Sequence, residues 1–125
     1  MNTLLRVLVV LPGIFFTVMG LMWLTAPASA AGALGMPLLD GVGRSTQIAD
    51  LAVFFLAIGL MILLAATSLQ GRWFQVPALM LIGAAIFRVL AWLIHDAALA
   101  VEPIALEVVV GCLLLLASSR LAEKE

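Results

Sequence analysis

Long apolar stretches constrain this chain more than any other feature of its sequence. Four of them have the length of a membrane span, at residues 4–25, 47–69, 74–95 and 103–119. A transmembrane helix needs about 20 mostly apolar residues, because the hydrocarbon core is about 30 Å thick and a helix rises about 1.5 Å per residue. We therefore expect an all-α, integral membrane four-helix bundle that forms a single domain over residues 1–125.

The composition agrees with a protein whose solvent is the bilayer. Hydrophobic residues make up 66% of the 125 residues and charged residues only 10%. A soluble domain needs a polar exterior, which so few charges cannot supply. The net charge of −1 and the lack of a basic run also exclude nucleic-acid binding, which depends on clustered Lys and Arg. The single Cys112 excludes an intramolecular disulfide.

The connections predict how the stretches are arranged. Residues 70–73 form so short a link that the second and third helices are expected to make an antiparallel hairpin. Residues 26–46 mix glycine and proline with apolar residues, which predicts an interfacial loop or short re-entrant helix over one end of the bundle. The first stretch, with Arg6 at its start and Ala-Ser-Ala at 28–30, also resembles a secretory signal. Its apolar run is longer than a usual signal core, so we expect a retained transmembrane helix.

The basic residues predict the orientation. With the N- and C-termini both cytoplasmic, four basic residues lie on the inner side and only Arg44 on the outer side, which satisfies the positive-inside rule, while Arg88 is left within a helix. The inner residues are Arg6, Arg72, Arg120 and Lys124. Asp96 and Glu102 then fall on the outer side. Trp23 and Trp92, near the outer helix ends, are expected to be aromatic anchors at the interface.

Ionisable residues inside the predicted spans are the main candidates for a site, since a charge at mid-bilayer costs about 2.5–3.5 kcal/mol. Arg88 lies about 10 Å from the outer end of its helix, and Asp50 and Glu107 lie about 7 Å and about 6 Å from theirs. Because these depths nearly coincide, we expect the three side chains to meet in the outer half of the bundle. Trp92 and His95 follow Arg88 at i+4 and i+7 and share its helix face.

This predicted charge cluster has three open roles. The first is an internal network that fixes helix register. The second is the polar end of a pocket that binds a lipid- or quinone-like molecule or carries a proton. The third is a contact with another membrane subunit. His95 and the scattered carboxylates lack the usual metal-ligand spacing, and neither GxxxxGK nor GxSxG occurs. We therefore predict no metal, no cofactor and no catalytic residue.

Small residues predict where helices approach closely. Gly13, Thr17 and Gly20 form one stripe on the first stretch, and Gly111 lies one turn after Glu107. Small side chains let helix backbones come together in lipid, where no hydrophobic drive acts between helices. We expect both sets to face the interior.

A further set of residues is distributed over all four stretches. It comprises Gly13, Gly20, Arg44, Gly59, Arg88, Asp96 and the run Glu107-Val108-Val109-Val110-Gly111. This set resembles the DoxX-like superfamily of small four-helix bacterial membrane proteins. Phe87 departs from the pattern, which has Gly before the arginine, and Asp50 stands where small or aromatic residues are usual. The resemblance implies a multi-pass protein of the bacterial cytoplasmic (inner) membrane with an accessory role, as a subunit of a redox complex or as an assembly chaperone.

These patterns favour a non-enzymatic protein. We expect an accessory or structural subunit, or an assembly factor, that contacts the bilayer and either other membrane-protein subunits or copies of itself. The alternative is a binder, or an enzyme, for a lipid- or quinone-like ligand at Asp50, Arg88 and Glu107. Proton or ion permeation along Asp50, Glu107 and His95 has less support, because no ionisable residue completes the path through the inner half.

Overall fold

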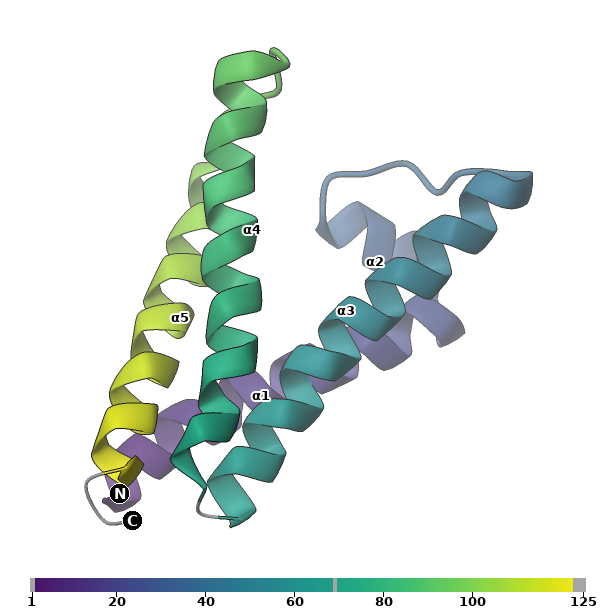
Figure 1. The fold of residues 1–125 in the computed structure, drawn as a ribbon. Helices are drawn as coiled ribbons and strands as arrows, with labels where there is room; N and C mark the ends of the chain where they lie inside the picture. Colours follow the sequence, from purple (N-terminus) through teal and green to yellow (C-terminus); the bar gives the residue numbers. More distant parts are fainter. Residues whose placement is uncertain (1, 69, 123–125) are drawn as a thin grey trace.

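The computed structural model describes residues 2–68 and 70–122, and this part of the chain is all-α (Figure 1). Its elements are α1 (Thr3–Thr25), α2 (Pro27–Ala33), α3 (Gly41–Ser68), the 3-10 helix η1 (Gly71–Phe74), α4 (Gln75–Ile94) and α5 (Val101–Ala122). Four helical segments in it are long and apolar enough to cross a membrane, namely α1, α3, η1 with α4, and α5. The prediction of an all-α protein with four candidate spans is confirmed.

Some helix ends differ from those expected. The region 26–46, expected to be an interfacial loop or a short re-entrant helix, contains the short helix α2 and the start of α3. Pro27 begins α2, since proline lacks the amide hydrogen that the first turn of a helix leaves unbonded. α3 begins at Gly41 rather than at residue 47, and Arg44 in its first turn pairs with Asp40 at 3.0 Å. Residue 69, the expected end of the second span, and Lys124 lie outside the described residues.

The long helices form two pairs that meet at one end (Figure 1). α1 packs along α3, and α4 packs along α5. The pairs approach each other at the end that carries both chain termini and η1, which we call the terminal end. They diverge toward the opposite end, which we call the open end and which carries α2 and the α4–α5 connection. The arrangement is therefore wedge-shaped, a feature that the prediction of a four-helix bundle did not include.

Glycines explain why α1 and α3 lie so close together. A Cβ added at Gly20 would lie 2.9 Å from the backbone nitrogen of Leu56. One added at Gly59 would meet Thr17 and would lie 2.8 Å from the carbonyl oxygen of Gly13. Backbone approach of this kind is possible only where side chains are small. The prediction that Gly13, Thr17 and Gly20 face the interior is confirmed.

The terminal end holds the part of the core that joins the two pairs. Phe74 of η1 is fully buried, and η1 packs against α3, α4 and α5. Gln75 Nε2 donates a hydrogen bond to Ser118 Oγ at 3.5 Å, which links the first turn of α4 to the end of α5. A Cβ added at Gly111 would lie 2.6 Å from Ile82 Cγ1, so Gly111 also faces the interior as expected. The contacts of η1 with α3, α4 and α5 join the two pairs at this end, whereas the Gln75–Ser118 and Gly111–Ile82 contacts hold α4 against α5 within one pair.

Trp23 is fully buried, so the prediction that it anchors the chain at the lipid interface is wrong. The reason is α2, which packs against α1 and contributes the buried Ala30 and Ala31 to the same apolar cluster. Trp92 has 45% of its surface exposed, which is compatible with an interface position.

Candidate functional site

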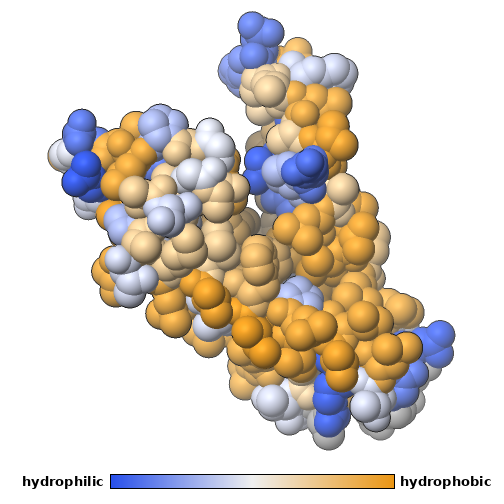
Figure 2. Space-filling view, turned by 180° about the vertical axis from the view of Figure 1, so that it is seen from behind, coloured by the Kyte–Doolittle hydropathy of each residue, from blue (hydrophilic) through white to orange (hydrophobic). Residues whose placement is uncertain are grey.

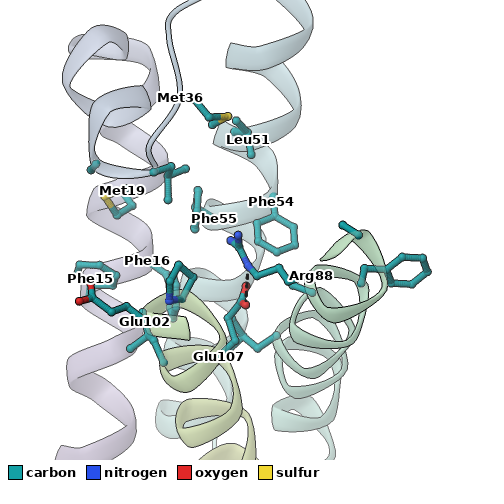
Figure 3. Close-up of a pocket in the computed structure, with 18 residues that line it drawn as sticks. Phe15, Phe16, Met19, Met36, Leu51, Phe54, Phe55, Arg88, Glu102 and Glu107 are labelled. Atoms are coloured by element: carbon teal, nitrogen blue, oxygen red, sulfur yellow. Dashed lines mark hydrogen bonds and ion pairs between the residues drawn. The ribbon is translucent and has the colours of Figure 1, made fainter. Parts of the chain in front are cut away.

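A pocket of about 730 Å³ lies between the two helix pairs, in the half of the molecule nearer the open end. Seen from behind, the molecular surface is hollowed between the pairs (Figure 2). Phe16 and Met19 of α1 and Phe54 and Phe55 of α3 line one side (Figure 3), and Leu81 of α4 also lines the pocket. Ligand pockets usually enclose about 300–1,000 Å³ and are mostly apolar with a few polar groups. The volume and lining therefore suit a molecule with a large apolar part.

The polar feature of the pocket is an ion pair between α4 and α5. Arg88 Nε donates a hydrogen bond to Glu107 Oε1 at 2.8 Å. The Glu107 side chain is only 8% exposed, whereas that of Arg88 is 38% exposed. Figure 3 shows the terminal nitrogens of Arg88 directed away from Glu107, into the pocket beside Phe54. The pair thus combines a buried carboxylate with a guanidinium whose outer edge is accessible.

Within residues 2–68 and 70–122, Arg88 makes no other ion pair or side-chain hydrogen bond. The terminal N–H groups of its guanidinium are therefore available to an acceptor that enters the pocket. Arginine binds carboxylate and phosphate oxygens through parallel hydrogen bonds, because its N–H groups form a planar fork. The site can accordingly bind an oxygen-rich head group while its walls hold apolar chains.

Asp50 does not join this pair, so the expected meeting of three charges is wrong for this residue. Asp50 is exposed and forms no ion pair in the described part of the chain. It lies one helical turn before Phe54, which lines the pocket, but Asp50 itself does not line it. Similar predicted depth therefore did not bring the three side chains together.

Trp92 and His95 also lie outside the pocket, although they were expected to share the face of Arg88. Both are exposed, and neither lines the cavity. Figure 1 gives the reason, since the last turns of α4 extend beyond the neighbouring helices at the open end. The stripe continues past Arg88 but meets no packed helix there.

Glu102 is a pocket residue that the sequence argument assigned only to the outer surface. It lies in the first turn of α5 and lines the pocket together with Pro103. In the view of Figure 3, Glu102 and Phe15 are drawn on one side of the pocket and Arg88 on the other. Glu102 lies only five residues before Glu107, so the sequence already placed both carboxylates near the start of the same helix.

Gln47 is a second residue that the sequence argument did not select. It is 8% exposed; its Oε1 accepts a hydrogen bond from the Leu39 amide at 2.9 Å, and its Nε2 donates to the Pro37 carbonyl at 3.0 Å. These bonds hold the segment after α2 against α3, where Leu34 and Met36 line the pocket. An uncharged amide at the start of an apolar stretch was the available signal.

The described residues contain no group of three or more His, Cys, Asp or Glu placed to hold a metal ion. Comparisons with protein-family models, with curated proteins and with solved structures found no match. No family is thereby identified, and the four candidate spans describe a small four-pass membrane protein whose apolar helices contact the lipid bilayer.

Proposed function

We propose that this protein binds an amphipathic, lipid-like molecule in the pocket between its two helix pairs. The observation that supports this most directly is the position of Arg88. Its guanidinium stands in the wall of a mostly apolar pocket of about 730 Å³, with its outer edge turned toward the cavity. An amphipathic molecule meets both requirements, because its chains cover the apolar walls and its head group accepts hydrogen bonds from Arg88.

A purely structural salt bridge explains the same residues less well. A buried pair that only fixes helix register needs good geometry and partners for its remaining donors, since an unpaired polar group in hydrocarbon costs several kcal/mol. Glu107 meets the first condition, with its 2.8 Å hydrogen bond. Arg88 does not meet the second, because its terminal nitrogens have no partner among the described residues. A bound head group supplies those partners.

The test fills the pocket without changing any charge. Ala84 and Ala91 line the cavity on α4, so Ala84→Trp with Ala91→Trp places two indoles inside it. The matched control is Leu79→Trp with Ile86→Trp, which has the same i, i+7 spacing on the same helix but lies on exposed positions. Native mass spectrometry of protein purified in mild detergent measures the lipid retained. We expect retention by the wild type and the control and loss by the filled variant; equal retention in all three contradicts the proposal.

We also propose, as a second function, an accessory-subunit or assembly-factor role in a membrane complex, which the resemblance to the DoxX-like superfamily implies. The four candidate spans make up most of the described chain. A partner protein would therefore contact mainly the faces of these helices, which supports docking within the membrane. A photoreactive amino acid in place of Leu51, a pocket residue, separates the two proposals. Cross-links to lipid support ligand binding in the pocket, whereas stoichiometric cross-links to one protein support docking there.

For the orientation, we propose that both termini face the cytoplasm of a bacterial cell. Arg6, Arg72 and Arg120 belong to helix ends at the terminal end, and Arg44 belongs to the start of α3 at the open end. This distribution agrees with the positive-inside rule. It puts the pocket in the outer half of the membrane, where outer-leaflet lipids have access to it.

A further inference from the structure

We infer that the pocket recognises a zwitterionic head group that carries a phosphate and an ammonium. The phosphate binds the terminal nitrogens of Arg88, and the ammonium lies between Glu102 and Phe15. This inference rests on the proposed function, because it names the class of lipid that the pocket takes. Its basis is the charge and placement of the few polar side chains around the cavity.

The charges that line the pocket do not suit an anionic lipid. Arg88 is the cation, and Glu102 and Glu107 are the carboxylates, so the formal charge of the lining is −1. Glu107 already neutralises Arg88 through their hydrogen bond. A head group with a net negative charge would add a further like charge beside Glu102, and such contacts disfavour binding. Phosphate oxygens on Arg88 are acceptable only if the same ligand also brings a positive charge.

Glu102 provides the place for that positive charge. It is exposed and makes no ion pair or hydrogen bond with any side chain in the described residues. It precedes Glu107 by about 7.5 Å along the axis of α5, so the two carboxylates face different parts of the pocket. In the view of Figure 3, Glu102 and Phe15 are drawn on the side of the cavity opposite Arg88, and all three line it. Opposite charges thus face the pocket from two separate positions, which matches a head group with two separated charges.

Phe15 adds a second preference for a cation at this position. Its ring lines the pocket and is 49% exposed. The face of an aromatic ring attracts ammonium groups, and the attraction strengthens when the cation is partly desolvated. A carboxylate and an aromatic ring on the same side of the cavity favour an ammonium over a neutral hydroxyl head group. Primary and quaternary ammonium groups both satisfy this chemistry, so the test includes both.

The experiment is a competition among lipids with identical acyl chains. The full chain is freed of lipid in detergent and mixed with equal amounts of phosphatidylethanolamine, phosphatidylcholine and phosphatidylglycerol, and native mass spectrometry measures each adduct. We expect zwitterionic adducts to exceed phosphatidylglycerol adducts in the wild type. Glu102→Gln should lower that ratio by up to about fivefold, the size expected for one partly exposed ion pair. The control Asp96→Asn removes a carboxylate that does not line the pocket and should leave the ratio unchanged.

The outcomes separate this inference from the proposed function. A wild-type protein that retains no lipid of any class overturns the proposed function and this inference with it. Retention with phosphatidylglycerol equal to or above the zwitterionic lipids overturns the inference alone, and so does a ratio unchanged by Glu102→Gln. The wild-type competition needs no variant, and Glu102 is exposed, so loss of folding does not obscure either result.

Discussion

Removing Arg88 alone, or Arg88 and Glu107 together, tests whether their pair stabilises the fold, binds a ligand, or does both. Arg88→Ala leaves the Glu107 carboxylate, 8% exposed, without its partner inside a membrane span. Breaking a buried pair in this way typically costs about 3–5 kcal/mol, whereas replacing both partners with apolar residues of similar volume is often neutral. We therefore expect Arg88→Ala to lower the free energy of unfolding by about 3 kcal/mol, toward the low end because Arg88 is partly exposed.

The double variant Arg88→Met with Glu107→Leu should unfold within about 1 kcal/mol of the wild type, because no buried charge remains. Unfolding is followed by tryptophan fluorescence during titration with a denaturing detergent. Native mass spectrometry then reports lipid retention by the same samples. A folded double variant that has lost its lipid assigns binding to the Arg88–Glu107 pair. The reasoning is refuted if the double variant is as unstable as Arg88→Ala, or if it keeps lipid at the wild-type level.

Two further predictions concern the framework around the pocket. Gly59→Ala should destabilise the fold by about 1–3 kcal/mol, because its Cβ would meet the backbone of Thr17, whereas Gly83→Ala has open space and should be neutral or stabilising by up to about 1 kcal/mol; equal thermal stability of the two variants would argue against the close α1–α3 contact. Gln47→Leu should release the segment that follows α2, because Leu39 and Pro37 lose their hydrogen bonds to its amide. Amide hydrogen exchange at Leu39 measures this, and unchanged protection there would show that other contacts hold the segment.

Depth along a helix was predictable from the sequence, and rotation around it was not. The ends of the apolar stretches predicted similar levels for Arg88 and Glu107, and Arg88 Nε lies 2.8 Å from Glu107 Oε1 in the structure. Asp50 is exposed and does not line the pocket, although Leu51 and Phe54 near it on α3 do. The side of α3 that packs against α1 is set by Gly13, Thr17 and Gly59 together, through close contacts between helices. A single apolar helix contains little information about such contacts.

The pocket itself had no signal in any one stretch of sequence. It exists because α1 with α3 and α4 with α5 diverge from the terminal end, and that divergence depends on contacts among all four helices. Glu102 was assigned to the outer surface because it lies in the connection just before the predicted fourth helix. In the structure it lines the pocket, because the two helix pairs diverge there. Gln47 was not selected because an amide carries no charge and therefore no large cost in the membrane.

The wedge also separates the residues that stabilise the fold from those that bind. Phe74 and Leu114 are fully buried and belong to the elements joined at the terminal end, whereas the polar pair and Glu102 lie around the pocket nearer the open end. Polar groups inside a membrane reduce stability unless they are partnered, so a protein that keeps them for binding must obtain its stability elsewhere. Tight packing at one end meets this need, because it fixes the positions of both helix pairs without filling the space between them. Substitutions that weaken the terminal core should therefore reduce stability and binding together, whereas substitutions at Glu102 or Phe15 should change binding alone.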